Sequence, residues 1–273
     1  MRVRLVLNPR SRRGRSFADA VRVALRNRGV DVAESPRPNG ADAIVVAGGD
    51  GTLVGEIPRA LERDVPVGIV PLGTFNDLAR TLGIPLDVAG ACDVIAAGRT
   101  RRIDAARVNG TYYVSEASIG ISSRLARRQR PEEKQRFGLL AIVGSALTAV
   151  RYARAFHAEV SYGSTKERLR VVQLTVANSQ RFGGFITVDD AAIDDGELDL
   201  YAVEIESAGQ LFSVASAIVL GNRRLARGLH TRRATAFDVW TRRPHHISAD
   251  GEPAGKTPAR FEVLPGALRV FVP

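Results

Sequence analysis

The chain has 273 residues, of which 45% are hydrophobic and 25% are charged, and its mass is 29.4 kDa. This composition excludes the disordered, collagen-like and coiled-coil classes, and the length fits two domains or one large α/β unit. The formal net charge is +10 and the isoelectric point is near 10.6. Such an excess of basic residues predicts attraction to polyanions, which are nucleic acid, an anionic membrane or a phosphate-bearing ligand.

The number of cysteines and the length of the apolar segments indicate in which cellular compartment the protein resides. Cys92 is the only cysteine, which excludes an internal disulfide framework and a multi-cysteine metal site. The first apolar run, Val3–Leu7, is too short for a signal peptide. The uncharged stretch Phe137–Val150 is shorter than the roughly 20 residues that a membrane-spanning helix needs. We therefore expect a cytoplasmic protein that does not cross a membrane.

Strand-like and helix-like segments alternate in the first part of the chain. The predicted strands are Val3–Leu7, Val30–Ala33, Ala43–Ala47 and Val67–Val70. The predicted helices are Ser16–Arg28, Leu53–Leu61, Thr74–Leu82 and Val88–Ala97. Alternation of this kind, with short and almost wholly apolar strands, is typical of a parallel sheet covered by helices on both faces.

The second part of the chain is dominated by short strands. The predicted strands are Ile103–Val108, Thr111–Glu116, Phe156–Ser161, Leu169–Ala177, Leu198–Val203, Ala234–Trp240, His245–Ala249, Arg260–Leu264 and Leu268–Val272. The predicted helices are Leu139–Ala155 and Ala208–Leu220. This pattern favours an antiparallel sandwich. We therefore predict an α/β domain at residues 1–104 and a β-rich antiparallel sandwich domain at residues 105–273.

A glycine-rich turn, Gly48-Gly49-Asp50-Gly51-Thr52, follows the third predicted strand. In open α/β sheets, ligands bind beyond the carboxyl ends of the parallel strands, where glycines let the backbone approach and a helix N-terminus offers free N–H groups to anions. Asp50 would repel a phosphate unless Mg²⁺ bridges them or the carboxylate bonds to a ligand hydroxyl. The alternative is a plain strand–helix turn in which Asp50 interacts with the helix dipole.

A second polar turn, Pro71-Leu72-Gly73-Thr74-Phe75-Asn76-Asp77, follows the next predicted strand. Thr74 and Asp77 have the spacing of a capping box, which is an alternative explanation for both residues. That explanation accounts for neither Gly73 nor Asn76. Because both turns leave neighbouring strands at the same end, we predict that together they build one crevice.

Several other motifs are absent from the sequence. It has no Walker P-loop, no G-x-G-x-x-G after a strand and no G-x-S-x-G elbow, and its four histidines lack zinc-site spacing. The arginine-rich runs contain no interleaved aromatic residues and no recognised nucleic-acid module. We therefore expect no nucleic-acid partner.

The two polar turns together resemble the catalytic domain of the diacylglycerol kinase family, which includes soluble bacterial lipid kinases and the sphingosine and ceramide kinases. The resemblance extends through most of the chain. The other matching segments are Asn8-Pro9-Arg10-Ser11, Asn178 with Gly183-Gly184, Ala191 with Asp194-Asp195-Gly196-Glu197-Leu198-Asp199-Leu200, and Asp250-Gly251-Glu252.

This resemblance implies both a fold and a reaction. The implied fold is an N-terminal α/β nucleotide-binding domain, related to phosphofructokinases and NAD kinases, packed against a β-rich C-terminal domain, with the active site in the cleft between them. The implied cofactors are ATP and Mg²⁺. The implied reaction transfers the γ-phosphoryl group of ATP to a lipid hydroxyl, on diacylglycerol or a similar lipid.

The same resemblance implies roles for individual residues. The implied nucleotide-binding residues are Asn8, Ser11, Gly48, Gly49, Gly51, Thr52, Gly73, Thr74, Asn76 and Asp77. Asp50 and Asp77 would organise the catalytic Mg²⁺, and Asp104 is a further candidate for that network. Glu252 is implied to be the general base, with Asp250 beside it. A plain hairpin turn is the alternative explanation for Asp250 and its glycine neighbour.

The segment Asp189–Asp199 holds six acidic residues and no basic one. Mutual repulsion disfavours such a run, and a cation would relieve it. Because related bacterial kinases have a structural Mg²⁺ at this turn, the resemblance implies Asp194, Asp195 and Asp199 as metal ligands. The alternative is a solvated acidic loop.

Two arginine-rich clusters, at residues 124–136 and 223–243, bear on how such an enzyme would reach its substrate. We expect peripheral association with an anionic membrane that carries the lipid substrate, although each arginine alone also fits a solvated surface. A homodimer is compatible with the sequence. Two other functions stay open, an NAD-kinase-like enzyme of a soluble hydroxyl substrate and a catalytically weakened membrane-binding homologue. The second arises because Glu34–Asp42 replaces a helix that the family normally has.

Overall fold

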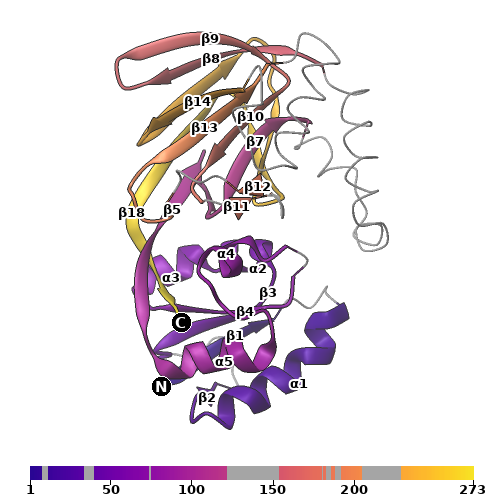
Figure 1. Ribbon diagram of the computed structural model, residues 1–273, viewed down its shortest axis with the longest axis vertical. Coiled ribbons are helices and arrows are strands. Elements are labelled where there is room, and N and C mark those ends of the chain that lie inside the picture. The colour runs from indigo at the N-terminus through magenta and orange to yellow at the C-terminus, as the bar shows by residue number, and fades with distance from the viewer. Residues whose placement is uncertain are drawn as a thin grey trace.

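The computed structural model describes residues 1–7, 12–33, 40–73, 75–121, 154–179, 181–182, 186–187, 192–204 and 229–273. These residues form two units, which lie one above the other in Figure 1. The lower unit contains the described helices and the N-terminus, and the upper unit consists of strands. The C-terminus returns to the lower unit, so the chain crosses between the units twice.

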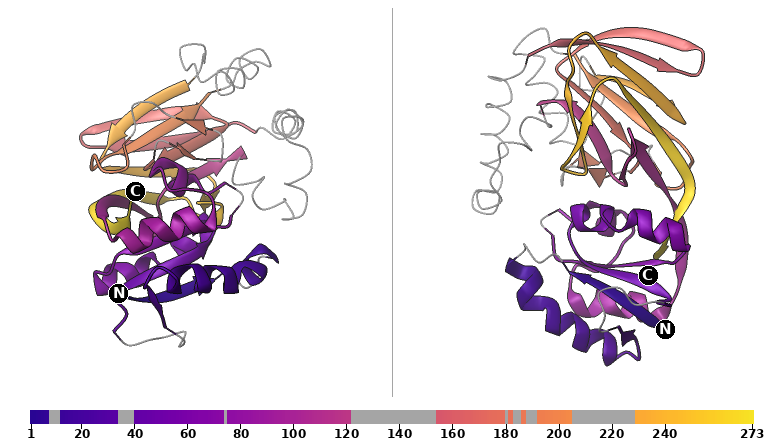
Figure 2. Two further views of the ribbon diagram at one scale, coloured as in Figure 1. Left: turned by 60° about the horizontal axis from the view of Figure 1, so that its bottom comes forward. Right: turned by 180° about the vertical axis from the view of Figure 1, so that it is seen from behind.

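The lower unit is built on a parallel sheet. Its strands, in spatial order, are β2 (Asp31–Val32), β1 (Arg2–Leu7), β3 (Ala43–Gly48) and β4 (Val67–Pro71). Its helices are α1 (Arg12–Arg26), α2 (Asp50–Val54), α3 (Ile57–Arg63), α4 (Asp77–Thr81) and α5 (Val88–Ala97). Figures 1 and 2 show α2, α3 and α4 on one face of the sheet and α1 and α5 on the other. All residues of β3 and β4 are buried, as expected of strands covered on both faces.

The upper unit is a sandwich of two antiparallel layers. One layer consists of β14 (Leu229–Ala234), β13 (Leu198–Val203), β10 (Gln173–Ala177), β7 (Glu116–Gly120), β16 (His246–Ala249) and β17 (Glu252–Lys256). The other consists of β18 (Ala259–Phe271), β15 (Ala236–Thr241), β8 (Phe156–Tyr162) and β9 (Thr165–Val171), with β5 (Thr100–Val108) beside β18 and β6 (Thr111–Tyr113) beside β5. A separate short hairpin is formed by β11 (Arg181–Phe182) and β12 (Ile186–Thr187). Buried apolar side chains of both layers, among them Ile119, Leu174 and Phe261, form one core. The predicted fold class is therefore confirmed.

Strands β5 and β18 join the two units. β18 pairs with β15 in the upper unit and with β4 in the lower unit, and β5 runs antiparallel to β18 along its length. The register between β5 and β18 shifts between Leu264 and Leu268. The two strands predicted at Arg260–Leu264 and Leu268–Val272 are therefore one strand with a bulge, because the extra residues are accommodated without ending the pairing. The predicted domain boundary at residue 104 falls within β5 and stays a prediction.

Some predicted elements are divided differently in the structure. The helix predicted at Leu53–Leu61 spans the end of α2 and most of α3, because α2 ends at Val54 with Gly55 as its C-cap. The strand predicted at Thr111–Glu116 is the end of one hairpin and the start of a new strand, β6 and β7. The strand predicted at Leu169–Ala177 comprises the end of β9 and all of β10. Strands β14 and β17 were not predicted as separate elements.

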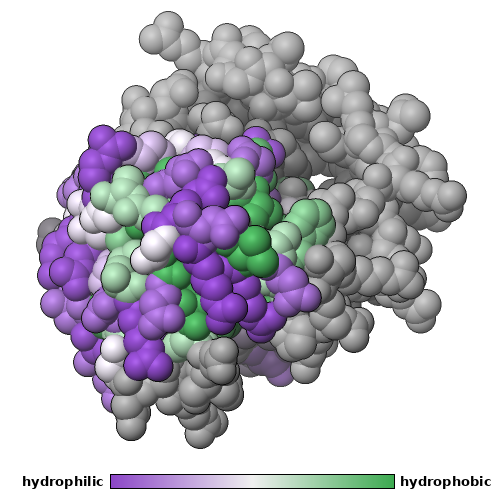
Figure 3. Space-filling model, turned by 90° about the horizontal axis from the view of Figure 1, so that it is seen from below, coloured by the Kyte–Doolittle hydropathy of each residue, from purple (hydrophilic) through white to green (hydrophobic). Residues whose placement is uncertain are grey.

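Figure 3 shows the face at the lower end of the molecule, where hydrophilic residues surround smaller hydrophobic areas. The exposed large apolar side chains of the described residues are Met1, Phe17, Val23, Leu86 and Trp240. None of the described helices is long and apolar enough to cross a bilayer. The predicted helices Leu139–Ala155 and Ala208–Leu220 lie outside the described residues, except Arg154 and Ala155, which are not helical.

Candidate active site

The two glycine-containing turns meet at one edge of the parallel sheet, as predicted. β3 and β4 are parallel neighbours with Gly48 opposite Pro71, so the turns that follow them leave the sheet side by side. A Cβ atom on Gly73 would lie 2.4 Å from the Cα atom of Gly49. Since this contact joins two backbones, a side chain on Gly73 would force the turns apart. Gly48, Gly49 and residues of α2 and α4 enclose a small pocket between the turns.

Asp50 links the first turn to the second. It is the first residue of α2, and its carboxylate accepts long hydrogen bonds from the backbone amides of Asp77 (3.3 Å) and Leu78 (3.4 Å) at the start of α4. Burial raises the pKa of Asp50, and these two hydrogen bonds oppose the rise. The carboxylate therefore lies in the crevice at the point where the two turns meet.

Asn76 closes the second turn on itself. Its side-chain oxygen accepts a hydrogen bond from the Gly73 amide (2.9 Å), and its side-chain nitrogen donates one to the Gly73 carbonyl (3.0 Å). Asn76 has a positive φ of 53° and precedes α4, which begins at Asp77. A capping box that starts at Thr74 would need the helix to begin at residue 75, so that alternative explanation is wrong. Asn76 and Gly73 instead form the turn that presents Asp77.

The structure describes only some of the remaining predicted nucleotide-binding residues. Asn8, Ser11 and Thr74 lie outside the described residues. Thr52 lies in α2, and its Oγ1 is 2.8 Å from the position that a Cβ atom on Gly48 would take. Gly48 is thus needed so that Thr52 can pack against the end of β3. The structure brings Gly48, Gly49, Thr52 and the second turn together, as the sequence predicts.

Asp250 lies in the hairpin turn between β16 and β17. Asp250 and Gly251 both have positive φ values, of 46° and 85°, as a two-residue type I′ turn requires. The hairpin alternative for this motif is therefore correct as far as the backbone is concerned. The turn also has a second role, because it brings the Asp250 side chain to the start of β7.

The Asp250 carboxylate is occupied by backbone amides. It accepts hydrogen bonds from the amides of Val114 (2.7 Å), Ser115 (3.1 Å) and Glu116 (2.9 Å). Burial is the largest cause that raises its pKa to about 7; the backbone hydrogen bonds lower it and the charge of Asp50 raises it. Both oxygens of Asp250 thus hold the hairpin turn to the start of β7. The catalytic role of Asp250 beside the base stays a prediction.

Glu252 reaches across from the upper unit to the lower unit. It is the first residue of β17 and is exposed. Its Oε1 lies 3.2 Å from the position that a Cβ atom on Gly51 would take, so the carboxylate lies against the first turn of α2. Among the implied catalytic residues, Glu252 is the one whose carboxyl group is both exposed and beside the glycine turn.

Glu116 is a site residue that the sequence analysis did not identify. Burial raises its pKa to about 8, and the nearby charges of Asp250 and Asp77 raise it further. It is the first residue of β7, in which Ala117 and Ile119 face the sandwich core, so Glu116 points to the opposite face. The alternation of side chains along β7 is the signal that could have identified Glu116. The strand predicted from the sequence ends at Glu116, so this alternation is not visible in it.

Carboxyl groups from both units therefore approach one another in the crevice. Repulsion among them contributes to the raised pKa values of Glu116 and Asp250, and a cation would relieve it. Within the described residues, no three acidic or other ligating groups are arranged to hold a metal ion by themselves. Mg²⁺ in kinase sites needs only one or two carboxylates, because substrate phosphates supply further ligands. Asp50 and Asp77 stay the predicted ligands of an ion that would bind together with a nucleotide.

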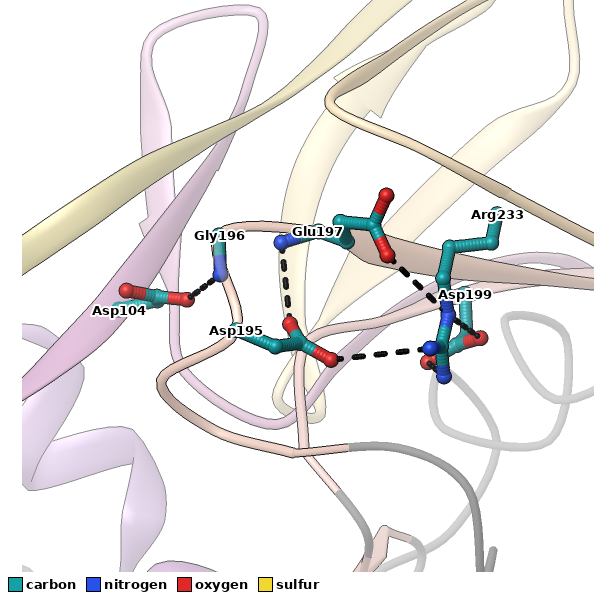
Figure 4. Close-up of polar contacts among 6 residues, drawn as sticks. All are labelled: Asp104, Asp195, Gly196, Glu197, Asp199 and Arg233. Carbon is teal, nitrogen blue, oxygen red and sulfur yellow. Dashed lines mark hydrogen bonds and ion pairs between the residues drawn. The ribbon is translucent and has the colours of Figure 1, made fainter.

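The acidic turn does not present its predicted metal ligands as one set. Asp194 pairs with Arg101, whereas Asp195 and Asp199 both lie beside Arg233, as Figure 4 shows for the latter two. Two arginines therefore face these carboxylates, and their role as metal ligands stays a prediction. The acidic residues at positions 189 and 190 lie outside the described residues.

Asp104 is also placed differently from its prediction as part of the Mg²⁺ network. It is 2% exposed, and its two oxygens accept hydrogen bonds from the amides of Gly196 and Gly266, both at 2.7 Å. Its own carbonyl accepts a hydrogen bond from the side chain of Asn178 (3.2 Å), which also donates to the Val114 carbonyl (3.0 Å). Asp104 thus fastens the acidic turn to the bulge of β18, where the chain crosses between the units.

Two family models match the chain. One, described as Diacylglycerol kinase catalytic domain, matches residues 2–108, and the other, described as YegS C-terminal NAD kinase beta sandwich-like domain, matches residues 115–272. The chain is 27% identical over 235 residues to a diacylglycerol kinase from Staphylococcus saprophyticus, which covers 85% of this chain and 77% of that protein. It is 28% identical over 241 residues to an uncharacterized protein from Synechocystis, covering 86% of this chain. The chain spans 55% of the length of that second relative.

Solved structures share the fold. A crystal structure of a diacylglycerol kinase from Bacillus anthracis str. Sterne superposes with a TM-score of 0.77 at 23% identity, covering 100% of this chain and 97% of that one. Another structure from the same organism gives a TM-score of 0.80 at 23% identity, covering 100% of this chain and 95% of that one. The structural matches support the fold, and the two family models confirm the predicted resemblance and the prediction of a kinase. The chain belongs to the diacylglycerol kinase catalytic-domain family.

Proposed function

We propose that the chain is an ATP- and Mg²⁺-dependent lipid kinase that transfers the γ-phosphoryl group to a hydroxyl of diacylglycerol or a similar lipid. The observation that carries this proposal is the contact across the crevice, where Glu252 of the upper unit lies against Gly51 of the lower unit. A phosphate bound at the glycine turn would therefore have this carboxylate beside it. The family membership supports the same reaction class.

The lower unit would supply the phosphate side of the reaction. Gly49 lets the first turn pack closely against Gly73, and Gly51 lets Glu252 lie against the start of α2. A phosphate would bind at this turn beside the N-terminus of α2. Asp50 is held in place by the amides of α4, so its position does not depend on the ligand. A Mg²⁺ ion held by Asp50 and Asp77 would neutralise charge on the phosphates.

The upper unit would supply the acceptor side. Glu252 is exposed and can receive the proton of a lipid hydroxyl as that hydroxyl attacks the γ-phosphorus. One P–O bond forms to the lipid, the P–O bond to ADP breaks, and the hydroxyl proton passes to the Glu252 carboxylate. Asp250 fixes the hairpin turn from which Glu252 projects, through its three backbone hydrogen bonds.

An anionic membrane is the proposed source of the lipid. Arg242 and Arg243 are exposed after β15, and each such charge contributes about 1 kcal/mol at an anionic surface. Arg232 and Arg233 of the same predicted cluster instead pair with acidic residues, so they contribute less to such a surface. The cluster at residues 124–136 lies outside the described residues.

The proposal can be tested by incubating the protein with γ-labelled ATP and Mg²⁺ in parallel reactions that contain diacylglycerol, a total lipid extract or NAD. Label in diacylglycerol supports the proposal in full. Label in another lipid of the extract supports a lipid kinase and identifies a different acceptor. Label in NAD alone would favour the NAD-kinase-like alternative, and the absence of label in every reaction would contradict the proposed transfer.

A further inference from the structure

The acidic turn has a cation of its own within the chain. Arg233 Nε lies 3.1 Å from Asp199 Oδ1 and 3.5 Å from Glu197 Oε2, and its Nη1 lies 4.0 Å from Asp195 Oδ2. Figure 4 shows the guanidinium group facing all three carboxylates. A planar guanidinium with several N–H donors can serve more than one carboxylate, which a lysine ammonium does less well.

This arrangement follows from strand pairing. β13 and β14 are antiparallel neighbours, and their register places Arg233 directly opposite Asp199. Cross-strand pairs of opposite charge stabilise a sheet. The hydrogen bond to Asp199 is the largest of the causes that raise the pKa of Arg233, so the cation is permanent. Asp199 is the least exposed of the three acids, with 15% of its side chain accessible, and it makes the shortest contact.

Two further carboxylates at the turn also accept backbone hydrogen bonds. Asp195 Oδ1 accepts a hydrogen bond from the amide of Glu197 (3.0 Å). Asp104 approaches the turn from β5, but its two oxygens accept from Gly196 and Gly266. The Mg²⁺ that the family resemblance implies here therefore finds no ready ligand set among the described residues. An ion at this position would have to displace the guanidinium group.

The turn is also connected to the crossing between the two units. Asp104 joins Gly196 of the turn to Gly266 in the bulge of β18, and β18 is one of the two strands that run through both units. A turn held in a fixed position thus supports the bulge, which lies on the path from the sandwich to the parallel sheet. Loss of the cation would act on this connection as well as on the turn.

We propose that the guanidinium group of Arg233 is the structural cation of the acidic turn, so that the turn folds and supports the crossing between the units without a divalent metal ion. This inference goes beyond the proposed function, because it concerns folding and does not depend on which substrate is phosphorylated. The inference concerns only a structural ion at the acidic turn, which this chain does not need. It does not concern the ion that would bind in the crevice together with the nucleotide.

Thermal unfolding without nucleotide tests the proposal. The background for this test is Asp50→Asn, which lacks a carboxylate of the crevice, and this variant should unfold at the same temperature in excess EDTA and in millimolar Mg²⁺ or Ca²⁺. Arg233→Gln removes the cation and leaves three carboxylates together, so its unfolding temperature in EDTA should fall by roughly 2–6 °C. Divalent ions should then recover part of that loss, because an ion can bind the acids that the guanidinium has left.

Arg232→Gln is the matched control. Arg232 is the neighbouring residue on β14, and it pairs with Glu167 (2.9 Å) rather than with the acidic turn. Its substitution also removes an ion pair, but no metal-dependent recovery should follow. If Arg233→Gln does not fold, Arg233→Lys keeps a cation with fewer donors and should show a smaller loss that divalent ions do not recover.

A metal-binding measurement completes the test. Asp50→Asn removes a carboxylate of the crevice, so divalent ions that still bind this variant without nucleotide report on other sites. The proposal expects no stoichiometric binding of Mg²⁺ or Ca²⁺ by this variant at millimolar concentration. Stoichiometric binding that Asp199→Asn abolishes, or an unfolding temperature of Asp50→Asn that drops in EDTA, would overturn the proposal. Neither readout requires the protein to have kinase activity.

Discussion

The Cα atom of Gly49 lies 2.4 Å from the position that a Cβ atom on Gly73 would take. The two turns that follow β3 and β4 therefore pack backbone against backbone, with no side chain between them. This contact brings the start of α4 close enough for Asp50 to accept its amides. The crevice consequently depends on the absence of a side chain at Gly73.

Gly73→Ala should damage the crevice. The new Cβ atom would meet backbone, which cannot rotate away, so we expect a strain of about 1–3 kcal/mol and weaker ATP binding by roughly tenfold or more. Gly55→Ala is the control, because its Cβ atom would meet only ordinary contacts, the nearest at 3.5 Å, and Gly55 has helical backbone angles. Calorimetric titration of both variants with ATP and Mg²⁺ measures the effect. Equal ATP affinity for the two variants would contradict it.

Glu252→Gln should lower turnover far more than nucleotide affinity. Gln has nearly the same shape but cannot accept the hydroxyl proton, and the loss of a general base costs roughly 10²–10⁴ in rate. Initial rates at varied ATP should therefore show a reduced kcat with a nearly constant KM for ATP. Glu159→Gln is the control, because Glu159 lies in β8 and is not part of the crevice, and this variant should behave as the wild type. Wild-type turnover by Glu252→Gln would show that the assigned role is wrong.

Asp250→Asn should lower the stability of the protein as well as its turnover. In Asn an NH₂ group replaces one of the two carboxylate oxygens, and it cannot accept a hydrogen bond from the backbone amide that this oxygen binds in the wild type. A buried donor left without a partner costs about 1–3 kcal/mol of stability. We expect a lower unfolding temperature for this variant, whereas Asp238→Asn, at an exposed ion pair, should change it little. An unchanged unfolding temperature combined with abolished turnover would indicate instead that Asp250 takes part directly in the chemistry.

The stability of the metal-free protein should fall as pH rises from about 4.5 to about 8. Burial raises the pKa of Glu116 from 4.5 to about 8, so the folded protein keeps a proton that the unfolded chain has already lost in this range. Each increase in pH therefore favours unfolding. Asp250, whose pKa is raised to about 7, acts in the same direction.

Glu116→Gln isolates the contribution of one group to that pH dependence. The variant needs no proton at this position, so its unfolding temperature should depend less on pH than that of the wild type, and the difference should be greatest near pH 8. Glu62→Gln, at an exposed position of α3, should follow the wild-type curve. Parallel curves for Glu116→Gln and the wild type would contradict the assignment of Glu116 as a buried acid.

The glycine turns of the site could be predicted because their signal is local. Three glycines around Asp50, directly after an apolar strand, indicate a ligand-binding turn without knowledge of any distant contact. The second turn gains its meaning from the parallel pairing of β3 and β4, which the alternation of elements also predicts. The fold class and the position of the crevice followed from these two patterns.

The partners of the acidic residues could not be predicted, because they come from distant segments. Asp104 bonds to Gly196 and Gly266, which are 92 and 162 residues away along the chain. Arg233 lies on β14, an edge strand with no fully buried residue, so the hydrophobic pattern gave no sign of a strand there. The sequence therefore indicated that the acidic turn needs a cation, but not that the cation is an arginine.

The most direct test of the central claim is transfer of label from γ-labelled ATP to purified diacylglycerol in mixed micelles, measured for the wild type and for Asp50→Asn with Mg²⁺ present. The account predicts labelled phosphorylated lipid with the wild type and none above background with the variant. Equal labelling by both proteins would contradict the role of the crevice. No labelling of any lipid by a folded wild-type protein would contradict the assignment as a lipid kinase.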